Sequence, residues 1–63
     1  MSNHATFDCT DAIIEWVKDN LNSGYFLVLP PHVHSLCPDE IKKHPNVKVN
    51  KMLDENEVEI TVR

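Results

Sequence analysis

The run YFLVL (residues 25–29) decides the fold of this 63-residue chain, because it predicts a strand that is buried on both faces. The run is short and continuously apolar, and a turn residue lies at each end, Gly24 before it and Pro30 after it. Side chains alternate along a strand, so this one has two distinct faces. One face carries Tyr25, Leu27 and Leu29, and the other carries Phe26 and Val28. Both faces therefore need cover, either from this chain or from another one.

Before the strand, residues 7–23 predict the main helix. Its apolar residues recur at the spacing of one helical stripe: Cys9, Ile13, Trp16, Val17 and Leu21. Gly24 follows as a typical left-handed end of a helix. The stripe predicts that Cys9 and Trp16 belong to the core, although a tryptophan can also anchor an interface.

After the strand, residues 30–45 have the sequence PPHVHSLCPDEIKKHP and predict a stiff connector. Proline has no N–H to donate to a sheet, so Pro30 and Pro31 end the strand. Within the connector, residues 38–44 predict one or two helical turns. Acidic residues come first in this segment and basic residues last, which suits the dipole of a helix.

The C-terminal part of the chain predicts a hairpin. Apolar residues alternate along two arms, with Val47, Val49 and Leu53 in the first and Val58, Ile60 and Val62 in the second. The polar segment 54–57 has a common length for the turn between them. Lys48 and Lys51 on one arm can face Glu57 and Glu59 on the other, which favours pairing of the two arms.

These elements predict a single small domain, residues 1–63, of the α+β class. The expected order is two-layer α-β-α-β-β, with one main helix and one short helix against a small three-stranded sheet that ends in a C-terminal hairpin. The sequence leaves open whether residues 1–6 are ordered or disordered.

The balance of charge argues against nucleic acid as a partner. The chain has a formal net charge of −4, from 10 acidic and 6 basic residues, and only Lys42 and Lys43 are adjacent basic residues. Phosphate backbones need clustered lysines and arginines, so the basic surface of another protein is the better match.

Location is predicted from three features of the sequence. It has no apolar run of about 18 residues that would span a membrane. Its first ten residues lack the basic start and apolar core of a secretory signal. Two cysteines are too few for a disulfide framework. We expect a cytoplasmic protein with reduced thiols, no contact with membranes and no cofactor.

The polar residues of the connector suggest an alternative function, a zinc-stabilised module. Four candidate ligands lie there: His32, His34, Cys37 and His44. Their H-x-H-x2-C-x6-H spacing matches no standard zinc finger or knuckle. The favoured interpretation is a surface loop in which Cys37 is a small buried residue.

An enzyme is the third hypothesis. A nucleophilic cysteine needs a neighbour that lowers the thiol pKa, and only Cys37 has histidines nearby in the sequence. Nothing in the chain predicts an oxyanion hole or a substrate cleft, so we expect no catalytic residues.

The sequence favours a small acidic non-enzymatic protein-binding module, acting as inhibitor, adaptor or regulatory subunit of a larger protein. The chain has surplus apolar surface on its central strand, and exposed apolar surface usually marks an interface. A homodimer is the simplest way to cover it. The candidate binding residues are three acids of the main helix, Asp11, Glu15 and Asp19, and three residues of the strand, Tyr25, Phe26 and Val28.

Overall fold

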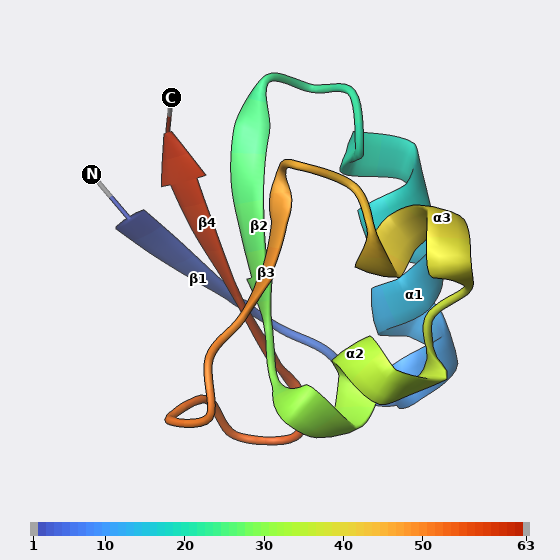
Figure 1. The fold of residues 1–63 in the computed structure, drawn as a ribbon. Helices are drawn as coiled ribbons and strands as arrows, with labels where there is room; N and C mark the ends of the chain where they lie inside the picture. The colour runs from blue at the N-terminus through green and yellow to red at the C-terminus, as the bar shows by residue number, and fades with distance from the viewer. Residues whose placement is uncertain (1, 63) are drawn as a thin grey trace.

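The structure is a computed structural model that describes residues 2–62 and shows a small two-layer α+β domain. The elements along the chain are β1 (Ser2–Thr6), α1 (Thr10–Asn20), β2 (Tyr25–Leu29), α2 (Pro31–Leu36), α3 (Asp39–Lys42), β3 (Val47–Val49) and β4 (Glu57–Val62). All three of these helices lie on one side of a single sheet (Figure 1). The predicted α+β class is confirmed, and the helices of residues 2–62 cover one face of the sheet only.

The central strand at 25–29 is confirmed. The order of strands in the sheet is β1-β4-β2-β3, so β2 has a neighbour on each side. It runs parallel to β3 and antiparallel to β4. Leu27 and Leu29 point into the core and are fully buried, as the continuous apolar sequence predicts for a strand of this kind.

The prediction of a C-terminal hairpin is wrong, because β3 and β4 do not pair with each other. Strand β2 lies between them and pairs with both. The connection from β3 to β4 passes the end of β2, where the Asn50 N–H donates to the Leu29 carbonyl at 2.9 Å. A hairpin would leave the most apolar strand at an edge of the sheet, whereas the observed order satisfies its backbone groups on both sides.

Within residues 2–62 the sheet has four strands instead of the expected three, because residues 2–6 form β1. This strand pairs antiparallel with β4, from Ser2 opposite Thr61 to Thr6 opposite Glu57. Its sequence, SNHAT, is too polar for an apolar pattern to indicate a strand. Polar side chains are typical of an edge strand, and β1 lies at an edge of this sheet.

Helix α1 confirms the main helix but is shorter than residues 7–23. Its core side is formed by Ile13 and Val17, which are fully buried. Cys9 is not a core residue as predicted, because it precedes the first helical residue and is exposed. Phe7 takes up the apolar contact at this end, with its ring 5.5 Å from the half-buried ring of Trp16.

The connector is more than a stiff link between strands. It forms two helices, α2 and α3, of which only α3 was expected. Pro31 occupies the first position of α2, where the missing N–H costs nothing. Val33, Cys37 and Ile41 recur every four residues along this segment and are all buried in the core. The connector therefore supplies part of the cover over the helix-side face of β2.

Candidate interaction surfaces

An acidic stripe runs along the side of α1 that faces away from the sheet. Its members are the predicted residues Asp11, Glu15 and Asp19, spaced by four, and all three are exposed. The opposite side of the same helix carries Ile13 and Val17, which fill the core. The arrangement follows from the helical period, which separates a buried apolar side from a charged outer side.

No ion pair among residues 2–62 involves a carboxylate of the acidic stripe. Within residues 2–62, the ion pair that the structure contains joins His4 and Glu59, on other elements. Carboxylates four residues apart on a helix repel one another mildly. One basic residue, Lys18, lies on the same helix, three residues after Glu15. The others in this part of the chain lie at α3 and around β3: Lys42, Lys43, Lys48 and Lys51. The stripe therefore keeps a net negative charge, because its three carboxylates outnumber the single lysine of α1.

A second candidate surface is the face of the sheet opposite the helices, here called the open face. Phe26 and Val28 of β2 point to it and are half-buried. The pairing of strands puts Glu59 beside Val28 on β4 and Lys48 beside it on β3. The surplus apolar surface expected of the strand is thus small, two side chains between residues of opposite charge.

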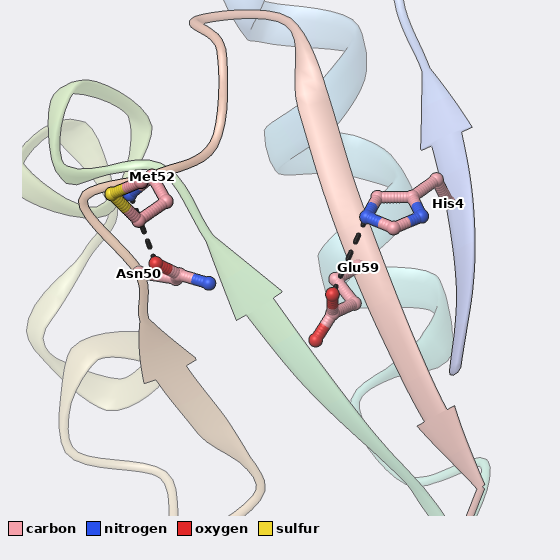
Figure 2. Close-up of polar contacts among 4 residues, drawn as sticks. All are labelled: His4, Asn50, Met52 and Glu59. Atoms are coloured by element: carbon pink, nitrogen blue, oxygen red, sulfur yellow. Dashed lines mark hydrogen bonds and ion pairs between the residues drawn. The ribbon is translucent and has the colours of Figure 1, made fainter. Parts of the chain in front are cut away.

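Two polar contacts hold the charged groups of the open face in place. The His4 Nε2 atom lies 3.3 Å from a carboxylate oxygen of Glu59, between neighbouring strands (Figure 2). The Lys48 ammonium lies 4.7 Å from the centre of the Phe26 ring, which is a favourable distance for a cation on an aromatic face. Neither contact was predicted from the sequence, because no strand was expected at His4 and Lys48 was expected to face β4 instead of β2.

The six predicted binding residues do not form one surface. The three acids of the stripe lie on the outer side of the helical layer, whereas Phe26 and Val28 lie on the open face. Tyr25 points to the helix side of the sheet, at the start of β2, and is 41% exposed. The structure therefore offers two separate surfaces, and Tyr25 belongs to neither of them.

The four residues of the zinc hypothesis are not assembled as ligands. Across residues 2–62, no group of three or more histidine, cysteine or acidic side chains is placed to hold a metal ion. The Cys37 thiol is buried and donates to the Val33 carbonyl at 3.3 Å. The Nδ1 atom of His44 accepts a hydrogen bond from the Asn46 N–H at 3.1 Å. Each of these two atoms is used within its own segment.

The electrostatics of Cys37 give it little nucleophilic character. Burial raises the pKa of its thiol above the ordinary value of 9.0, and the nearby lysines Lys42 and Lys18 oppose this only in part. The thiolate is the reactive form, so a raised pKa keeps this cysteine inert at neutral pH. Both cysteines are free in the structure.

A third feature lies in the connection from β3 to β4. The side chain of Met52 is 89% exposed, and the Met52 N–H donates to the Asn50 side-chain oxygen at 2.9 Å (Figure 2). Along this turn, a hydrogen bond to Asp54, partial burial and the Asp54 charge raise the pKa of Glu57. One exposed methionine is common on protein surfaces and by itself indicates no site.

The described residues enclose no pocket. No helix in the described part of the chain has the length and apolar character that crossing a bilayer requires. Comparison with known proteins gives no relative, since no protein family, curated protein or solved structure matches this chain.

Proposed function

We propose that this chain is a small non-enzymatic protein-binding module that docks its acidic stripe on a basic surface of a larger protein, as an inhibitor, adaptor or regulatory subunit. The observation that carries the proposal is the exposure of Asp11, Glu15 and Asp19 on one side of α1 without an ion-pair partner in residues 2–62. The stripe gains most from a partner of opposite charge, which would relieve the repulsion among its own carboxylates.

Two further features support this proposal. The chain carries a net charge of −4, and charge of one sign steers association with a surface of the other sign. The stripe also lies on a helix held to the core by Ile13 and Val17, both fully buried. A rigid surface loses little conformational freedom when it binds. Two free cysteines fit a reducing compartment, so we place the module in the cytoplasm.

The test begins with identification of the partner and then measures affinity for the purified protein. Affinity capture with the wild-type chain names candidates, and titration calorimetry gives dissociation constants. The stripe variant is Asp11→Asn/Glu15→Gln/Asp19→Asn. A matched control removes three exposed acids from other elements, as Asp39→Asn/Glu40→Gln/Glu55→Gln.

We expect the stripe variant to weaken binding at least about tenfold, with a smaller dependence on salt, because screening acts on exposed charges. The control also removes three negative charges, but none from the stripe. It should therefore change affinity by less than about twofold. Equal effects of the two variants would show that only net charge matters and that the stripe is not the docking surface. If no protein is captured, the proposal of a binding module loses its support.

A further inference from the structure

The open face carries a row of residues that changes sign from one side to the other. Val28 of β2 lies opposite Glu59 of β4 in one direction and opposite Lys48 of β3 in the other. The row therefore runs negative, apolar, positive across three adjacent strands. None of the helices in residues 2–62 covers this face (Figure 1).

This order of residues is complementary to itself. Consider a second copy stacked face to face, related by a two-fold axis that runs parallel to β2. Such an axis keeps each residue at its level along the strand and moves it to the opposite side. Val28 then meets Val28 of the second copy, and Glu59 meets Lys48 of the second copy, twice by symmetry.

We propose that the open face binds a second copy of this chain in this arrangement. Stacked sheets pack with their strands within about 30° of each other, so residues close to the axis keep these neighbours despite the twist of the sheets. Like charges would face each other in a stack related by an axis across the strands instead. Charge complementarity thus selects both the occupant and its orientation.

The contacts within one copy prepare the two charged groups for this role. The Lys48 ammonium lies over the Phe26 ring at 4.7 Å, and Glu59 lies 3.3 Å from His4. Both contacts keep the charges on the open face. They are formed before association, so less side-chain freedom is lost on binding.

The size of the molecule limits the strength of the dimer. The principal extents of the molecule, 25, 25 and 19 Å, limit any one face to roughly 600 Å² at most, below the ~800 Å² that each partner contributes to a standard stable interface. We therefore expect a reversible dimer with a dissociation constant on the order of 100 µM. This proposal does not depend on the acidic stripe, which lies on the other side of the molecule.

The experiment uses charge reversal and mixing. The variants are Lys48→Glu and Glu59→Lys. Matched controls that make the same charge changes are Lys43→Glu, directly after α3, and Glu40→Lys on α3. Sedimentation over a concentration series, up to about 2 mM, gives the dissociation constant of each, and circular dichroism confirms that each is folded.

Each single variant places like charges opposite each other twice, so its dimer should weaken at least about tenfold. An equimolar mixture of the two variants restores both opposite-charge contacts, because the new carboxylate of one variant then meets the new ammonium of the other. The mixture should therefore form a heterodimer within about threefold of the wild-type affinity. The controls should dimerise like the wild type.

Three results would overturn the proposal. These are a wild-type chain that stays monomeric at the highest concentration, a dimer that charge reversal leaves intact, or folded variants that fail to associate when mixed. If a variant does not fold, NMR spectra of the wild-type chain decide instead. Dilution should then shift the amide signals of Val28, Glu59 and Thr61 and leave those of α1 unchanged, whereas shifts confined to α1 or to the strand edges would reject the open face.

Discussion

The buried side chain of Ile41 offers a direct test of the role assigned to the connector. Ile41 lies in α3, a helix of four residues, and its side chain is fully buried in the core. So short a helix has no stability of its own. If the connector were only a stiff link, shortening this side chain would matter little, whereas a core role predicts a large loss of stability.

The size of the effect follows from burial and chain length. Changing a fully buried isoleucine to alanine costs about 3 kcal/mol, within the usual range for such a truncation. A 63-residue domain is expected to be stable by roughly 3–9 kcal/mol in total. Ile41→Ala should therefore remove between a third and all of the free energy of unfolding.

Urea denaturation followed by Trp16 fluorescence measures this loss. Trp16 lies on α1, with its ring against Phe7 and packed on the core, so its emission reports loss of the folded core. With a slope of about 1 kcal/mol per molar urea for so small a protein, the midpoint should fall by about 3 M. The control is Leu36→Ala, which shortens a side chain of the same connector that is 55% exposed.

The control should change the free energy of unfolding by less than about 0.5 kcal/mol, as is usual for surface positions. A loss below about 1 kcal/mol for Ile41→Ala, or equal losses for the two variants, would refute the reasoning. The core would then be formed by α1 and the sheet alone, and the connector would be the passive link that its prolines suggest.

Four other predictions test separate features. Gly24 has φ +91°, and a methyl group added at its Cα would have no atom within 4 Å, so Gly24→Ala should cost about 1–2 kcal/mol by denaturation through backbone strain alone. Removing residues 1–6 deletes β1 and should lower the free energy of unfolding by about 2 kcal/mol or more, because the backbone hydrogen bonds between β1 and β4 are lost. An unchanged melting temperature would show that β1 does not stabilise the domain. At pH 8, a thiol reagent should label the exposed Cys9 at once and Cys37 only on unfolding, because burial raises the pKa of the Cys37 thiol; equal rates would contradict this. The raised pKa of Glu57 means that the folded state binds this proton more tightly than the unfolded state does, so the stability it contributes is present below the ordinary pKa of 4.5 and is lost as pH rises through the folded pKa. The melting temperature of the wild type should therefore fall more over this rise in pH than that of Glu57→Gln.

The sequence predicted those parts of the fold that depend on local apolar patterns. Strand β2 and the core side of α1 follow from periods of two and of about four residues, which a buried strand and an amphipathic helix impose. Gly24 was expected as a left-handed residue and has a positive φ. Helix α3 was also expected, although its bounds are narrower than residues 38–44.

The errors concern pairing between distant segments and strands without an apolar pattern. Nothing local in the arms of the expected hairpin shows that β2 will lie between them, because that order depends on what the whole sheet gains. Strand β1 pairs with β4 along its whole length, and its polar side chains form no apolar pattern from which a strand could be predicted. Helix α2 was not predicted, because the adjacent prolines Pro30 and Pro31 indicated a stiff, non-helical connector. Val33 and Cys37 nevertheless have the spacing of buried residues on a helix.

Part of the candidate site could also be predicted from the sequence. The acidic stripe was predicted correctly as an exposed set, since spacing by four on a helix is a local property. The row on the open face was not, because Glu59 and Lys48 come together only through the strand order. The predicted hairpin put Lys48 and Glu59 on directly paired strands. In the observed sheet, β2 lies between their strands.

The two proposed surfaces have a joint consequence, because they lie on opposite sides of a two-layer domain. A dimer formed through the open face keeps both helical layers outside, so each copy still presents Asp11, Glu15 and Asp19. Such a dimer binds a repetitive or symmetric basic partner at two points, and the second contact forms at a high effective concentration. Lys48→Glu should then weaken binding to a partner with several sites while leaving affinity for a single site unchanged. Equal losses for both kinds of partner would show instead that Lys48 contacts the partner directly and that the open face is a docking surface in its own right.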